Sequence, residues 1–373
     1  MKRIVSKLHL WVSVPFGLVI MITCFTGAML VFESEITALC SGGASSVEPK
    51  GSPMPVWQII ERVEPSLDSG VEVTGVVIPF AADEAYKVNL SKPRRAALYV
   101  NQYTGEVQGE YRRPPFFDVM RRLHRWLMDR NPGNGAIFWG KVIVGASTLA
   151  FVVILLTGLL VWWPRNRKML KNRLKIVVSK GKNRFWYDLH VAGGFYTLLV
   201  LLAIALTGLT WSYRWYSDAF YNVFGVNGTN RGNGRSAIYA GNEVNTMAAE
   251  WKQGSNGMKY YPWQVAVAAV EGEYNDYGKM VISKESISVY ADAWGNQRAC
   301  DRYEFDSMTG ELKSVQKYDD NSKRSKMRGW VYSVHVGSWG GIFSRLLAFF
   351  AAILGATLPL TGYYFWIKRI YKK

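Results

Sequence analysis

The sequence predicts a membrane α+β protein with four transmembrane helices in two pseudo-repeats, each repeat carrying an outer domain of one helix and a small antiparallel sheet. Two observations lead to this prediction. Four windows of 22 or 23 residues lack any charged side chain, and the first two windows resemble the last two. A helix rises about 1.5 Å per residue and the hydrocarbon core is about 30 Å thick, so each window can span a bilayer. A single soluble domain is therefore excluded.

The predicted spans are residues 9–32, 139–163, 187–213 and 342–367. Residues 1–8 and 368–373 are then the two termini, and residues 164–186 form a basic loop on the same side. The first outer domain is residues 33–138, which include the segment around His124. The second outer domain is residues 214–341. The second outer domain contains an insertion rich in Gly and Asn at 225–257, which we interpret as a loop.

The net charge of +17 is concentrated on one side of this topology. Sixteen Lys and Arg residues lie at the N-terminus, at the C-terminus and in residues 165–184, where Asp and Glu are absent. Basic residues beside transmembrane helices mark the cytoplasmic side. The pattern predicts a multi-pass membrane protein with both termini in the cytoplasm and the outer domains on the opposite side, which is the periplasm in a Gram-negative bacterium. This distribution argues against nucleic-acid binding as the reason for the charge.

The internal repeat relates the two halves of the chain. Residues 9–32 match residues 190–213 at an offset of 181, which aligns His9 with His190 and the dipeptide Thr26-Gly27 with Thr207-Gly208. LTGLLVWWPR at 156–165 likewise resembles LTGYYFWIKR at 360–369. Each half therefore has the order His, helix ending in Thr-Gly, outer domain, His, helix ending in Thr-Gly.

Each outer domain is predicted to contain one helix followed by strands. The helices are expected at Val56–Val63 and Trp263–Val270, where apolar residues recur with helical spacing. The strands, bounded by turn residues, are expected at Val71–Ile78, Ala85–Leu90, Ala97–Val107, Met280–Ile282, Ser286–Tyr290 and Arg302–Val315. Turns are expected at Thr104-Gly105 within the third of these segments and at Thr309-Gly310 within the last.

Each of the four histidines precedes one of the four windows without charged residues, which begin at residues 10, 142, 191 and 346. Low-spin b-type haem needs two axial nitrogens, and facing helices of a bundle supply neutral imidazoles well. Pairing the histidines by depth predicts a haem between His9 and His190 on the cytoplasmic side and a second between His124 and His335 on the outer side. Spacing from the Thr-Gly dipeptides places His124 and His335 on helical extensions. The alternative is that the histidines are interfacial residues without a ligand.

Other features admit two interpretations each. The Thr-Gly dipeptides favour close helix packing, with approach to a flat ring as the alternative. Four arginines flank the outer histidines: Arg121, Arg122, Arg125 and Arg328. They are candidate contacts for haem propionates or substrate, and the alternative is that they are surface charges.

The cysteines limit the cofactor chemistry. No CxxCH motif occurs, so the haem is expected to be non-covalent. Cys40 and Cys300 lie on the oxidising side, where a disulfide is permitted.

A family resemblance is carried by LHRWL around His124, WWPR at 162–165 and YVNQYTGEV at 99–107. These motifs and the helices ending in Thr-Gly resemble the PepSY-associated transmembrane family, whose members include ferric-siderophore reductases. The resemblance covers nearly the whole chain. It implies four membrane helices, two periplasmic PepSY-like domains and two b-haems. The ligand positions it implies match His9, His124, His190 and His335.

Together with this resemblance, which implies the siderophore substrate and a bacterial inner membrane, the four histidines predict a di-haem b reductase that reduces Fe(III)-siderophore in the periplasm and releases the iron. Its partners would be the ferric-siderophore, the lipid bilayer and an electron donor that is a cytoplasmic reductase, a small reductant or a quinol. The chain has no GxGxxG motif after a strand, so a Rossmann site for NAD(P)H is not expected. The alternatives are a PepSY-domain binding or sensor protein without redox activity, and a siderophore permease.

Overall fold

The computed structural model describes residues 2–371 except 112, 134, 227–236, 239–257 and 292–294. The chain forms two compact units. Unit 1 comprises Met1–Glu33, Pro115–Gly228 and Trp330–Lys373, and unit 2 comprises Ser34–Pro114 and Thr229–Gly329. The expected insertion at 225–257 lies outside the described residues except for 225–226 and the short strand β5 (Ala237–Ile238).

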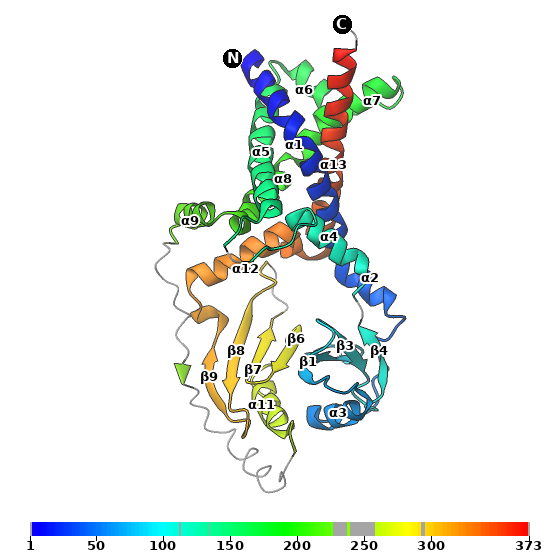
Figure 1. Cartoon of the computed structure of the whole chain (residues 1–373), viewed down its shortest axis with the longest axis vertical. Helices are drawn as coiled ribbons and strands as arrows, with labels where there is room; N and C mark the ends of the chain where they lie inside the picture. The colour runs from blue at the N-terminus through cyan, green and yellow to red at the C-terminus, as the bar shows by residue number, and fades with distance from the viewer. Residues whose placement is uncertain are drawn as a thin grey trace. The chain divides into compact units, whose positions relative to one another are not determined.

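Unit 1 contains four helical runs that are long and apolar enough to cross a membrane. They are α1 (Lys2–Val31), α5 (Trp139–Trp162), the run of α7 (Lys182–Asp188), η2 (Leu189–Gly193) and α8 (Gly194–Ser212), and α13 (Gly341–Ile370). α1 packs against α5 and α13, and α8 packs against the same two helices, which gives a four-helix bundle (Figure 1). Each expected span lies largely within one of these runs, and the protein is a multi-pass membrane protein.

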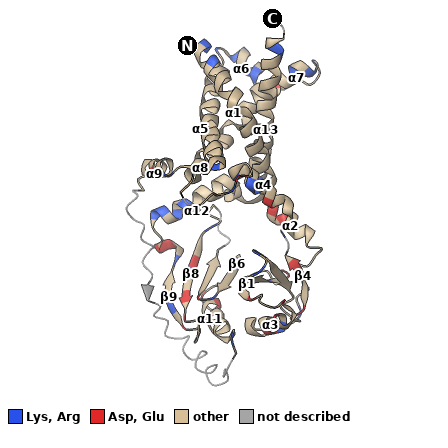
Figure 2. Ribbon diagram, in the orientation of Figure 1, with Lys and Arg blue, Asp and Glu red and all other residues tan. Residues whose placement is uncertain are grey.

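Shorter helices flank the bundle at both ends. α6 (Arg167–Arg173) and α7 lie at the end that carries both chain termini, and α9 (Arg214–Val223) follows α8 at the other end (Figure 1). Lys and Arg gather at the end with the termini (Figure 2). The charge asymmetry of the sequence is therefore present in the folded bundle.

His124 and His335 lie on separate helices, α4 (Pro115–Trp126) and α12 (Lys323–Val336), and the expectation of helical extensions is wrong. α4 ends because Leu127 and Met128 adopt positive φ values of 52° and 67°. α12 ends at Gly337, where φ is 77°, and the short turn η4 (Ser338–Gly340) leads into α13. These breaks account for the long spacing between each of the two histidines and the next Thr-Gly dipeptide.

Unit 2 contains one antiparallel sheet with the strand order β4-β3-β2-β1-β6-β7-β8-β9-β5. Its remaining strands are β1 (Val73–Pro79), β2 (Tyr86–Leu90), β3 (Ala97–Val100), β4 (Val107–Tyr111), β6 (Lys279–Ser283), β7 (Ser286–Tyr290), β8 (Cys300–Phe305) and β9 (Leu312–Gln316). The segments expected at 97–107 and 302–315 are each two strands joined by a turn. The strands of the two halves join through β1 and β6, which the sequence does not predict. Gly75 permits this pairing because a Cβ there would lie 2.5 Å from the carbonyl oxygen of Ile282.

Two helices, α3 (Val56–Val63) and α11 (Tyr261–Glu271), bury their apolar residues in the core of this sheet. The turns after β3 and β8 have the same hydrogen bonds in both halves. Asn101 Oδ1 accepts from the amides of Tyr103 and Thr104, and Asp306 Oδ1 accepts from those of the equivalent Met308 and Thr309. The sequence repeat thus corresponds to a repeat of local geometry.

The remaining described elements are short. They are α2 (Glu33–Cys40), η1 (Glu64–Ser66) and η3 (Tyr318–Asp320). Cys24, Cys40 and Cys300 are free thiols, so the permitted disulfide between Cys40 and Cys300 is not formed.

Candidate functional site: two histidine pairs in the helical bundle

His9 and His190 line one cavity of about 520 Å³ inside the helical bundle. His9 lies on α1, and His190 lies in the π-helical turn η2, a distortion that is frequent at functional sites. The walls between the two imidazoles are mostly apolar and include Phe151, Leu155 and Leu198. The volume is within the range of pockets that hold cofactors and other organic ligands.

His124 and His335 face each other on α4 and α12, with their ring centroids 6.1 Å apart. A metal–imidazole bond is about 2.0–2.1 Å long, so two imidazoles on opposite sides of one metal ion have centroids roughly 6.3 Å apart. The observed separation fits this arrangement without movement of either helix. Among the described residues, no group of three or more His, Cys, Asp or Glu side chains is placed to hold a metal ion.

Each imidazole rests on the glycine of a different Thr-Gly dipeptide. A Cβ at Gly27 would lie 3.0 Å from Cε1 of His124, and at Gly208 it would lie 2.8 Å from Cε1 of His335. At Gly158 the corresponding distance is 3.2 Å to His9, and at Gly362 it is 3.8 Å to His190. The dipeptides therefore accommodate a flat ring, the alternative to helix packing that the sequence left open.

The same dipeptides orient the imidazoles through Nδ1. The Nδ1–H groups of His9, His124 and His335 donate to the backbone carbonyls of Ile154, Thr23 and Ile204, at 3.1, 2.8 and 3.0 Å. Each acceptor lies three residues before the threonine of a Thr-Gly dipeptide. A carbonyl oxygen can only accept, so Nδ1 carries the proton and Nε2 keeps its lone pair. This is the arrangement of metal-binding histidines, whose second nitrogen is held by a hydrogen bond.

His190 is held by a threonine hydroxyl. Its Nδ1 lies 2.7 Å from Oγ1 of Thr361, and that hydroxyl donates its own proton to the carbonyl of Leu358 at 2.8 Å. The hydroxyl therefore accepts from Nδ1–H of His190. All four histidines thus present Nε2 away from the helix that holds them.

The outer pair is held in the neutral form that metal ligation requires. Burial lowers the pKa of His335 to about 4, and His124 is a second cause. Burial also lowers the pKa of His124, and the nearby cations Arg125 and Arg121 add to this effect. Both rings are therefore uncharged at neutral pH.

The four candidate arginines have different surroundings. Arg121 pairs with Glu33 at 2.5 Å, and Arg122 donates to the carbonyl of Met128 at 3.1 Å in the turn that ends α4. Arg125 is exposed and lies over the ring of Trp126, 4.6 Å from its centroid. Arg328 is exposed on α12, two helical turns before His335. Arg121 and Arg125 are the two that act electrostatically on His124.

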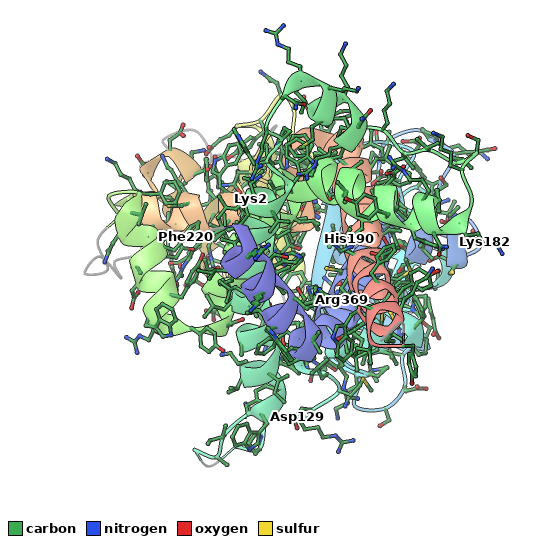
Figure 3. All side chains as sticks on the ribbon, turned by 90° about the horizontal axis from the view of Figure 1, so that it is seen from above. Lys2, Asp129, Lys182, His190, Phe220 and Arg369 are labelled. Atoms are coloured by element: carbon green, nitrogen blue, oxygen red, sulfur yellow. The ribbon has the colours of Figure 1, made fainter. Side chains whose placement is uncertain are left out.

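The end of the cavity nearest the chain termini also contains hydrogen-bond donors. Trp162, Arg173 and Arg369 line this part, together with His190 farther in. Figure 3 looks onto this end of the bundle and labels Arg369 and His190. The tryptophan stands in the WWPR motif, but an aromatic residue at a span end is ordinarily interpreted as an interfacial anchor.

Comparison with known protein families gives one match over almost the entire chain. The family model described as the PepSY-associated TM region matches residues 6–369. A comparison with curated proteins found no match. The matched region contains all four histidines and the four Thr-Gly dipeptides of the membrane-capable helices.

Proposed function

This chain belongs to the PepSY-associated TM region family, and from this premise and the two histidine pairs we propose that it is an inner-membrane reductase with two non-covalent b-haems. It passes electrons across the membrane to Fe(III) held by a siderophore in the periplasm, and so releases the iron. His9 and His190 hold one haem, and His124 and His335 hold the other.

The observation that carries the proposal is the matched orientation of the four imidazoles. Each donates Nδ1–H to an acceptor beside a Thr-Gly dipeptide, and each leaves Nε2 directed away from that helix. Interfacial histidines would have no reason to share this arrangement. Two rings with centroids 6.1 Å apart match the spacing of axial ligands, and an apolar cavity between the other two rings suits a flat macrocycle.

The residues of the bundle would hold, orient and isolate the cofactors. When bound, haem b supplies reversible one-electron exchange between Fe(III) and Fe(II). An apolar cluster that includes Ile20, Phe151 and Leu201 packs within the bundle, and Ile20 and Phe151 of this cluster also line the cavity of His9 and His190. Along α1, His9 and Gly27 are 18 residues apart, or about 27 Å, so the pairs lie toward opposite ends of the bundle.

The charge distribution supports a direction for the reaction. Lys and Arg are concentrated at the end of unit 1 that carries both termini, α6 and α7 (Figure 2). By the positive-inside rule this end is cytoplasmic, so the pair of His9 and His190 is the electron entry site. The outer pair then lies on the periplasmic side, and the two halves of unit 2 are periplasmic PepSY-like domains.

Reduction is an effective release step for this class of substrate. Hard oxygen donors hold Fe(III) far more tightly than Fe(II), so one electron lowers the affinity of the chelate for iron. The exposed cation Arg125 beside His124 would attract an anionic ferric chelate. The donor is a cytoplasmic reductase, a small reductant or a quinol.

The decisive experiment is the dithionite-reduced absorption spectrum of the purified protein, with pyridine haemochrome quantitation. We expect two b-haems per chain, extractable into acidified organic solvent, that are reoxidised by ferric-siderophore. A colourless protein would favour the binding or sensor alternative. One haem per chain or fewer would refute the two-site pairing, and haem that ferric-siderophore does not reoxidise would refute the substrate.

A further inference from the structure

The cytoplasmic-side cavity has one end with the chemistry of a carboxylate-binding site. Trp162 is the last residue of α5, Arg173 is the last residue of α6, and Arg369 lies in the last turn of α13. All three line the cavity that contains His9 and His190. The site thus combines two guanidinium groups with one indole N–H, which are all hydrogen-bond donors and accept nothing.

The indole of Trp162 is the observation that indicates a ligand. Its side chain is only 9% exposed, and its ring stacks on Phe195 with the centroids 3.8 Å apart and the planes at 9°. Nε1 is buried and has no hydrogen-bond partner among the described residues. A buried N–H without an acceptor costs free energy, so such groups are normally paired. A ligand oxygen in the cavity would supply the missing acceptor.

The arrangement along the helices gives the ligand a direction. On α5, Trp162 lies four residues beyond Gly158, which contacts His9. On α13, Arg369 lies seven residues beyond Gly362, which contacts His190. Both donors are therefore displaced from the imidazoles toward the same end of the bundle. Arg173 is fixed at this end because it donates to the carbonyls of Val161 and Trp162.

We propose that Trp162, Arg173 and Arg369 bind the propionate carboxylates of the haem held by His9 and His190, so that this haem has its propionates toward the chain termini. This inference rests on the proposed function and adds an orientation and three binding residues to it. The ligand class is a flat apolar ring with carboxylates on one edge. A quinol, which has no carboxylate, would leave the two guanidinium groups without counter-charge.

The test uses the haem-loaded protein in nanodiscs and measures haem transfer to excess apomyoglobin. Trp162→Phe keeps the aromatic stack and removes the N–H, and Arg369→Gln removes the charge. Trp163→Phe and Arg167→Gln are matched controls, because both residues are exposed and neither lines the cavity. We expect both test variants to lose one of the two haems about tenfold faster than the controls, as expected for one lost charge-assisted hydrogen bond. Arg369→Lys should restore most of the retention.

A second measurement keeps the inference testable if a variant folds poorly. Protein produced without haem is loaded with haem or with its dimethyl ester, which has no carboxylate charge. At the site of His9 and His190 the wild type should bind haem more tightly than the ester, and Arg369→Gln should discriminate less between the two compounds. Equal retention in test and control variants, with two haems in the wild type, would overturn this inference and leave the proposed function standing. A wild type without haem would refute both.

Discussion

The contacts between the Thr-Gly glycines and the histidines predict a graded response to one added methyl group. In Gly208→Ala the new Cβ would lie 2.8 Å from Cε1 of His335, and in Gly27→Ala it would lie 3.0 Å from Cε1 of His124. In Gly158→Ala the distance to His9 would be 3.2 Å. In Gly362→Ala it would be 3.8 Å to His190, an ordinary van der Waals contact. The four substitutions are chemically identical and differ only in the room available.

The expected magnitudes follow from two opposing effects. Alanine is favoured over glycine in a helix interior by about 1 kcal/mol. Overpacking in a close-packed interior costs about 1–3 kcal/mol. At Gly362 only the first effect operates, so Gly362→Ala should be neutral or stabilising by up to about 1 kcal/mol. At Gly208 the second effect prevails, and the net loss should be up to about 2 kcal/mol with displacement of the His335 ring.

The assay is the fraction of low-spin haem by absorption and electron paramagnetic resonance, together with the thermal midpoint of each variant. Gly208→Ala and Gly27→Ala should lower the low-spin fraction at one haem, while Gly362→Ala should keep the wild-type spectrum. Gly158→Ala should be intermediate. The reasoning would be refuted if Gly362→Ala were the most damaging variant, or if all four spectra were unchanged.

Three further predictions concern ligation, tuning and topology. His335→Ala should remove the outer haem and abolish reduction of external ferric-siderophore, while the haem at His9 stays low-spin. His9→Ala should leave the outer haem bound but cut it off from electrons that come from the cytoplasm. Loss of both haems from a folded His335→Ala protein would contradict independent sites. Thr361→Val removes the hydroxyl that accepts from Nδ1–H of His190. A redox titration should show that the midpoint potential of one haem rises by a few tens of mV. The control Thr357→Val, on the same helix, should leave the midpoint potential unchanged. Alkaline phosphatase fused after Lys92 or Lys284 should be active and after Lys175 inactive, and the opposite pattern would reverse the proposed direction of electron flow.

The features predicted correctly from the sequence are those encoded by short stretches of chain. Helix α3 has the predicted bounds, Val56–Val63, and strand β7 has the predicted bounds, Ser286–Tyr290. Both depend on local spacing of apolar residues, which is visible without knowledge of the partner. The four spans are predicted for the same reason, since each needs only an uninterrupted apolar length.

The features that were missed depend on contacts between distant residues. The junction of β1 and β6 requires a close backbone approach at Gly75, and a single glycine in a strand does not reveal its neighbour. Trp162 resembles any aromatic residue at the end of a span until its buried Nε1 is found without a partner. The end of α4 is marked by positive φ at Leu127 and Met128, residue types that rarely adopt it, although Asn131-Pro132-Gly133 in the same linker is a helix-breaking sequence.

The contacts of the histidines also explain why the repeat is present within one chain. Each histidine is held by a Thr-Gly dipeptide of its own half: His9 and His124 rest on Gly158 and Gly27, and the equivalent contacts recur in the second half. Each pair, however, takes one imidazole from each half. A single half therefore contributes only one imidazole at each depth. Because low-spin haem requires two axial nitrogens, neither site is complete until both halves are packed together, and their covalent linkage ensures that this happens in every molecule.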